Sequence, residues 1–117
     1  PRPSGDPPML TTARHNIAAR RDAAAAARRA TDAARAHLSR LPLAPGMAAR
    51  VDHRRDQTMG HLVTITAWWD HPVTGARVTA QDTVPAASGP FAAEQAAGRV
   101  VTMLLARLRA DRVEAAQ

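Results

Sequence analysis

The sequence has no cysteine and no lysine, and it has few large apolar residues. The absence of cysteine excludes disulfide bonds, thiolate zinc sites and cysteine nucleophiles. Leucine, isoleucine, valine and phenylalanine together supply only 19 of the 117 residues, so the core must be small and one domain is expected. No apolar run approaches the roughly 20 residues of a membrane span, and the Pro-rich start has no signal-peptide pattern. We therefore expect a cytoplasmic protein without a membrane partner.

Catalytic motifs are also missing. The sequence shows no Ser-His-Asp order, no phosphate-binding Gly-rich loop and no dinucleotide fingerprint. Its two glutamates, Glu94 and Glu114, lie at opposite ends of one predicted helix. Asp82 is the only acid expected on the inward face of the strands, and we expect it to accept a hydrogen bond from a neighbouring backbone N–H. The sequence therefore predicts neither an enzyme nor a bound cofactor.

Positive charge is the clearest feature that is present. The 16 arginines and 10 acidic residues give a net charge of +6 and a pI near 11.7. The 28 alanines, and the use of arginine without lysine, indicate a GC-rich coding genome, so codon bias supplies part of this basicity. A basic surface still favours polyanions. The expected partner is therefore a nucleic acid or an acidic protein surface.

Breaks in the pattern divide the chain into an arm and one domain. Residues 1–11 are rich in proline and are predicted to form a flexible arm, because they bury too little apolar area to become ordered. Thr11 or Thr12 is expected to cap a helix that runs to about Arg40, where the breaker at residues 41–46 ends it. Residues 12–117 then form a single α+β domain.

The predicted first helix has one apolar face made mainly of alanine. On a period of 3.6 residues, this face contains Leu10, Ala13, Ile17, Ala24, Ala27, Thr31, Ala34, Leu38 and Leu41. Along one flank of it, an arginine recurs every seven residues, at Arg14, Arg21, Arg28 and Arg35. Two interpretations stay open: a solvated edge covered by arginine stems, or a stripe that contacts phosphates or an acidic partner.

Three antiparallel strands are predicted where the pattern changes to a period of 2. Residues 61–69 alternate between an inward set, Val63, Ile65, Ala67 and Trp69, and an outward set, Leu62, Thr64, Thr66 and Trp68. A turn with Pro72 and Gly75 leads to residues 76–84, whose inward side chains include Val78, Ala80 and Val84. A weaker strand over residues 47–54 places Val51 inward and Arg50, Asp52 and Arg54 outward.

A second helix is predicted over residues 91–113. Ser88 is the expected N-cap, and Pro90 fits the first turn. This helix has the best apolar stripe of the chain, which comprises Ala93, Ala97, Val100, Val101, Leu104, Leu105 and Leu108. The stripe is predicted to form the core.

The predicted fold is α+β, in the order α-β-β-β-α. A three-stranded antiparallel sheet is packed on one face by the C-terminal amphipathic helix and by part of the long N-terminal Ala/Arg-rich helix. The alternative is a three-layer arrangement with the helices on opposite faces. The element order and the Glu94-Gln95-Ala96-Ala97 segment after Ser88 and Gly89 resemble a double-stranded-RNA-binding domain.

That family grips phosphates with a lysine cluster at the start of its last helix. Here the corresponding positions hold Pro90, Phe91, Ala92 and Ala93, and the first helix is longer than the family's. The resemblance therefore implies the fold, and no RNA contact is carried over to any residue.

The histidines do not form a metal motif. His53, His61 and His71 flank the predicted sheet, but their spacings follow from the strand lengths and lack a close ligand pattern. His15 and His37 lie on the first helix away from its apolar face and are expected at the surface. No metal site is predicted.

The two tryptophans are adjacent and must point to opposite faces of their strand. Trp69 is expected to fill the space left by an alanine core. Trp68 is expected on the outward face beside Arg77, unless the first helix or a second subunit covers it. An uncovered Trp68 can stack a nucleobase or anchor a protein interface.

Two functional hypotheses follow. The first is a non-catalytic nucleic-acid-binding module with Trp68 available for stacking, in which phosphates are contacted by Arg50, Arg54, Arg77, Arg14, Arg21, Arg28 and Arg35. The second is a structural or adaptor protein of a larger assembly, such as a bacterial or phage complex.

Self-association is a third expectation. The first helix has roughly 30 residues and about 45 Å of length, whereas strands of eight or nine residues span only about 30 Å. Part of the helix must therefore overhang the sheet. An antiparallel homodimer through the N-terminal helix would cover that part.

Overall fold

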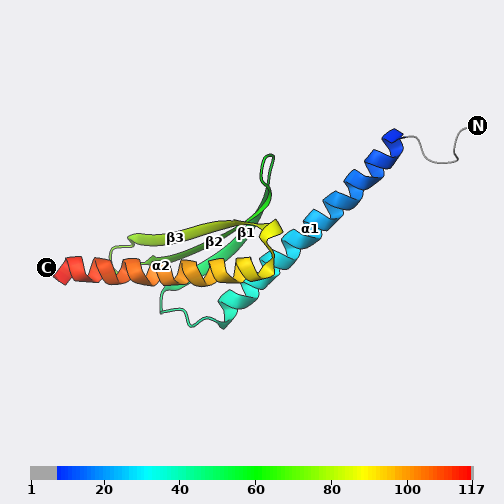
Figure 1. Ribbon diagram of the computed structural model, residues 1–117. Coiled ribbons are helices and arrows are strands. Elements are labelled where there is room, and N and C mark those ends of the chain that lie inside the picture. Colours follow the sequence, from blue (N-terminus) through cyan, green and yellow to red (C-terminus); the bar gives the residue numbers. More distant parts are fainter. Residues whose placement is uncertain (1–7, 117) are drawn as a thin grey trace, which may run out of the picture.

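The computed structural model describes residues 8–116, with side chains described for residues 13–112. The elements are α1 (Pro8–Arg40), β1 (Met47–Asp56), β2 (Gly60–Asp70), β3 (Arg77–Pro85), the 3₁₀ turn η1 (Ala86–Ser88) and α2 (Pro90–Ala116). The strands form one antiparallel sheet in the order β1-β2-β3. Figure 1 shows α2 running along the sheet, while α1 crosses one end of it and extends away. This is the predicted α-β-β-β-α fold.

The first helix starts earlier than the sequence indicated. It begins at Pro8, so residues 8–11 are helical, although the sequence predicts them as part of the flexible arm. A proline fits the first turn of a helix because the N–H that it lacks would have no helical partner there. Residues 1–7 of the predicted arm lie outside the described residues. At the other end, α1 stops at Arg40 as predicted, and Pro42 prevents its continuation.

The alternation of side chains correctly predicted the two faces of the sheet. Val51, Val63, Ile65, Ala67 and Ala80 are all buried on the inward face. Together with the buried residues of both helices they form one hydrophobic cluster. Both helices therefore pack on the same face, and the three-layer alternative is wrong.

The turn between β2 and β3 has the predicted glycine geometry. Gly75 has a positive φ of 72°, and its N–H donates to the carbonyl of His71 at 2.9 Å. The imidazole Nδ1 of His71 accepts hydrogen bonds from the N–H groups of Val73 and Thr74, each at 3.1 Å. His71 therefore stabilises the turn, a function that the sequence did not reveal.

A second glycine is required where the chain enters β1. Gly46 has a φ of 86°, and a Cβ atom added to it would lie 3.0 Å from Nε1 of Trp69. Trp69 is partly buried and packs against the core at this point, as predicted. The indole of Trp69 thus occupies the space that any larger residue at position 46 would need.

The cap predicted for the second helix is wrong by one residue. Ser88 ends η1, whereas Gly89 precedes α2 and accepts a hydrogen bond from the N–H of Ala93 at 3.3 Å. Pro90 is the first residue of the helix, as expected. The predicted apolar stripe is confirmed, because six of its members are buried and Leu105 packs against them: Ala93, Ala97, Val100, Val101, Leu104 and Leu108.

Small residues allow α1 and α2 to pack closely. Ala30 and Ala34 of α1 are fully buried, and so is Ala97 of α2. A Cβ atom added to Gly98 would lie 3.7 Å from Nε2 of His37, so this histidine approaches α2. His37 is half-buried, which corrects its predicted place at the surface. The alanine-rich face thus brings the two helix backbones together.

Only the C-terminal half of α1 belongs to the core. The buried residues of its apolar face lie between Ala27 and Leu38, whereas all side chains in residues 13–23 are exposed. Ile17 is 49% exposed. The molecule extends over 85 Å because α1 reaches far beyond the sheet (Figure 1). The overhang is therefore present, as the lengths of the helix and the strands predicted.

A truncation in α2 tests this core. We expect Leu104→Ala to lower the free energy of unfolding by about 2 to 5 kcal/mol, because it removes a fully buried side chain from a core that has few large ones. Thr102→Ala is the matched control on the exposed side of α2 and should change stability by less than about 0.5 kcal/mol. Urea unfolding measures both. A loss below about 1 kcal/mol for Leu104→Ala would contradict the assignment of this face to the core.

Candidate nucleic-acid interface

The outward face of the sheet holds Trp68 and the strand arginines singled out from the sequence. Trp68 lies on the central strand and pairs with Ala48 of β1 and Thr79 of β3. The guanidinium carbons of Arg50 and Arg77 lie over its ring, 5.9 and 5.3 Å from the centroid. Trp68 is therefore half-buried, and these arginines rather than α1 cover it. A nucleobase would have to displace a guanidinium to stack there.

Both of these arginines already have carboxylate partners. Arg50 Nε lies 2.9 Å from Asp52 Oδ2. Arg77 donates two hydrogen bonds to Asp70, at 2.7 and 3.1 Å. The Arg77 guanidinium holds the pKa of Asp70 below its usual value, and Asp70 raises the pKa of Arg77. Since the pKa of Asp70 is depressed by folding, this pair stabilises the fold above pH 3.8 and ceases to do so as the pH falls below that value.

Charges on this outward face are balanced. Asp56 also lies on it, where its Oδ1 accepts hydrogen bonds from the N–H groups of Thr58 and Met59, at 2.8 Å each. These two bonds, that of Met59 foremost, lower the pKa of Asp56. The face therefore has three arginines and three aspartates, at positions 50, 54, 77, 52, 56 and 70. With no net charge, it attracts phosphates less strongly than its arginines alone suggest.

The net positive charge of the protein lies on α1. This helix has 7 arginines and 2 aspartates, which gives it 5 of the 6 net positive charges. The flank predicted from the seven-residue spacing lies on the surface, where all four of its arginines are exposed: Arg14, Arg21, Arg28 and Arg35. Successive members of such a flank are about 10 Å apart along the helix axis.

The two predicted arginine sets meet at the edge of β1. A guanidinium nitrogen of Arg35 donates a hydrogen bond to the carbonyl of Val51 at 3.3 Å. Arg35 and Arg50 line the same shallow groove there, which has a volume of about 450 Å³. The structure therefore connects the helix flank to Arg50, whereas Arg54 and Arg77, on the same outward face as Arg50, do not line this groove.

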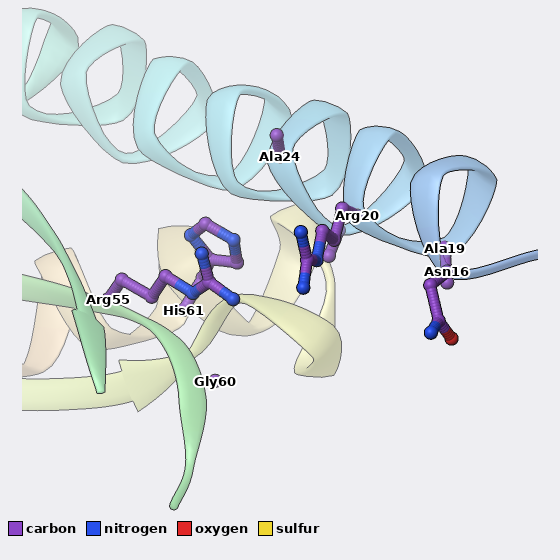
Figure 2. Close-up of a pocket in the computed structure, with 8 residues that line it drawn as sticks. Asn16, Ala19, Arg20, Ala24, Arg55, Gly60 and His61 are labelled. Carbon is purple, nitrogen blue, oxygen red and sulfur yellow. The ribbon is translucent and has the colours of Figure 1, made fainter. Parts of the chain in front are cut away.

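A larger groove separates the overhanging part of α1 from the β1–β2 hairpin, the segment formed by residues 53–63. It has a volume of about 640 Å³, and its lining includes Arg20 of α1 together with Arg55 and His61 of the hairpin. Figure 2 shows the polar ends of these three side chains in the space between the helix and the hairpin. No motif in the sequence had indicated this site. Arg55 follows Val51 by four positions on the same strand, so the alternation of side chains places both residues on the inward face of the sheet.

Two histidines stack within the same hairpin. Nε2 of His53 and Nδ1 of His61 are 2.6 Å apart, and the ring centroids are 4.8 Å apart with an interplanar angle of 16°. Within residues 8–116, no three histidine or acidic side chains gather in a way that would hold a metal ion. The strand pairing thus brings together two histidines that are eight residues apart in the sequence.

The one acidic side chain on the inward strand face binds an arginine. Asp82 accepts a hydrogen bond from the N–H of Thr83 at 2.9 Å, as expected from the sequence. Its other oxygen accepts two hydrogen bonds from the guanidinium of Arg99 in α2, at 3.0 and 3.3 Å. A further arginine of α2, Arg107, donates to the carbonyl of Thr79. These contacts fasten α2 to β3.

Comparisons with family models, with curated proteins and with solved structures give no match to this chain. The likeness to double-stranded-RNA-binding domains therefore rests on the order of the elements and the short segment quoted above. Neither α1 nor α2, over the residues described, is long and apolar enough to cross a membrane.

The covering of Trp68 can be tested by fluorescence. In a Trp69→Phe background Trp68 is the only tryptophan, and replacing Arg50 and Arg77 with alanine should increase its quenching by acrylamide, because both guanidinium groups lie over the ring. Arg54→Ala, on the same face but without a contact to the ring among the described residues, is the control and should leave quenching unchanged. Equal quenching in all variants would show that the arginines do not cover Trp68.

Proposed function

We propose that this protein is a non-catalytic module that binds nucleic acid through phosphate contacts, most of them made by the exposed flank of α1 that includes Arg21, Arg28 and Arg35. The observation that carries the proposal is the concentration of 5 of the 6 net positive charges on α1. Phosphate contacts of this kind depend on charge and need no sequence readout. A guanidinium suits them because it binds a phosphate through two parallel hydrogen bonds.

The placement of these arginines supports the proposal. Arg21 and Arg28 are exposed on α1, and Arg35 extends the same flank to the β1 edge beside Arg50. A basic surface therefore runs from the overhang of α1 to the sheet. The outward face, where Arg77 is bound by Asp70, contributes less because its charges are balanced. In this proposal Trp68 stabilises the sheet rather than stacking a base.

Salt dependence and matched charge variants test this proposal. The chain should bind duplex DNA, duplex RNA or single strands at about 50 mM salt and lose orders of magnitude in affinity by about 200 mM. The double variant Arg21→Gln/Arg28→Gln should lower the slope of log K against log salt by about 2, one for each lost phosphate contact. The sheet variant Arg54→Gln/Arg77→Gln removes the same charge and should change the slope less. No binding at the lower salt would refute the proposal.

A second candidate function is that of an assembly or adaptor protein. The observation that favours it is the exposed apolar strip of the overhang, in which Ile17 is 49% exposed. A second copy could cover this strip. However, two copies of α1 with 5 net positive charges each repel one another, so self-association should strengthen with salt, opposite to nucleic-acid binding.

Light scattering tests self-association. A dimer would have about twice the chain mass of 12.5 kDa, and Ile17→Glu should shift it toward the monomer. Ala18→Glu adds the same charge at the next position, which is also exposed but lies about 100° around the helix from Ile17 and outside the apolar face, and is the control. A species of 12.5 kDa at high salt and high concentration, with its helices intact by circular dichroism, would contradict self-association through α1.

A further inference from the structure

We infer that the groove between α1 and the β1–β2 hairpin binds a phosphate group, with Arg20 and Arg55 as its principal ligands and His61 as a third. The three side chains come from three elements, α1, β1 and β2, and line the same 640 Å³ groove. Their polar ends occupy one region in Figure 2, while the lining residue Asn16 lies farther along the helix. The inference rests on the proposed function for the source of the phosphate.

The charge of the groove favours an anion. No acidic residue is among its described lining residues. In contrast to Arg50 and Arg77, neither Arg20 nor Arg55 has a hydrogen bond or ion pair with any of residues 8–116. Two guanidinium groups that share a groove without a counter-charge repel each other, and an anion between them converts this repulsion into two attractions. Phosphate fits because each guanidinium can bind two of its oxygens.

The histidine pair supplies a further donor. Nδ1 of His61 is occupied by the contact with Nε2 of His53 at 2.6 Å. When His53 donates in this contact, His61 accepts at Nδ1 and has its own hydrogen on Nε2, the nitrogen that remains for a ligand. An anion in the groove stabilises this tautomer, because only an N–H can donate to it. The stacked pair also fixes the orientation of the His61 ring, since the ring planes differ by only 16°.

The size and position of the groove suit a phosphate within a chain. The volume of about 640 Å³ exceeds what a single phosphate needs and leaves room for the adjoining sugar. Arg20 and Arg21 are adjacent on α1, so the groove lies beside the flank that the proposed function assigns to the phosphate backbone. The phosphate can come from a nucleic-acid backbone or from a free phosphate compound, and the probes below distinguish these sources.

The first test compares two double variants of the full chain. Arg20→Gln/Arg55→Gln removes one arginine of α1 and one of β1 from the groove. Arg29→Gln/Arg54→Gln removes the same charges from the opposite side of α1 and the outward face of the sheet. The groove variant should weaken binding of a duplex oligonucleotide at about 0.1 M salt on the order of tenfold to a hundredfold, with the salt slope lower by about 2. The control variant should change both quantities much less, and all four arginines are exposed, so both variants should fold.

The second test follows the groove side chains directly by NMR. In labelled wild-type protein, the side-chain signals of Arg20, Arg55 and His61 are recorded while inorganic phosphate or the oligonucleotide is added. Shifts with both probes show a site that recognises phosphate itself and accepts a free compound. Shifts with the oligonucleotide alone show a site for backbone phosphate. Either result supports the inference.

Two results would overturn it, and they are separable from failure of the proposed function. If neither probe shifts these signals, the groove is not a phosphate site. The groove is also excluded as a phosphate site if the oligonucleotide binds but the groove and control variants lose the same affinity. If Arg21→Gln/Arg28→Gln then loses more affinity than both, the proposed function stands without the groove. Shifts with inorganic phosphate in a chain that binds no nucleic acid would keep the site and refute the proposed function.

Discussion

A core built largely of alanine is the constraint on which the rest of the structure depends. Ala30, Ala34, Ala67, Ala93 and Ala97 bury little area each, but their small size lets two helices and a sheet approach closely. Such a core is compact and short. It can hold α1 only where α1 faces the strands and α2, and the described half before Ala24 is exposed. The long basic overhang is therefore a consequence of how little apolar side chain the sequence provides.

Arginines have different surroundings on the two sides of the sheet. On the outward face, Arg50 and Arg77 are bound by aspartates and lie over Trp68, so they act as structural cover. Arg55 directly follows Arg54 in the sequence. Its side chain nevertheless lies on the inward side, in a groove whose described lining has no acidic residue. Strand alternation alone produces this difference, because consecutive side chains point to opposite faces. Charge counted along the sequence thus misses how it is distributed in space.

The groove depends on the position of α1 relative to the hairpin. Close contact of Ala34 with the core and the approach of His37 to Gly98 fix the angle at which α1 leaves the body. Arg20 then lies opposite the hairpin, roughly two turns before the first residue that the core buries. For the phosphate site that we propose, the helix fixes the backbone position of Arg20 before binding, so only its side chain remains to be ordered.

The sequence by itself determined the order of the elements, the strand alternation and the apolar stripe of α2. These follow from local periodicity, in which a residue's neighbours at two, three and four positions decide its face. The predictions of a cap at Ser88 and of the start of α1 were wrong, because proline and glycine at those sites allow more than one helix boundary. Only the tertiary structure decided which arginines are neutralised and which share a groove. Those outcomes depend on partners far apart in the chain, such as Arg20 with Arg55 and Asp82 with Arg99, and no local pattern encodes such distances.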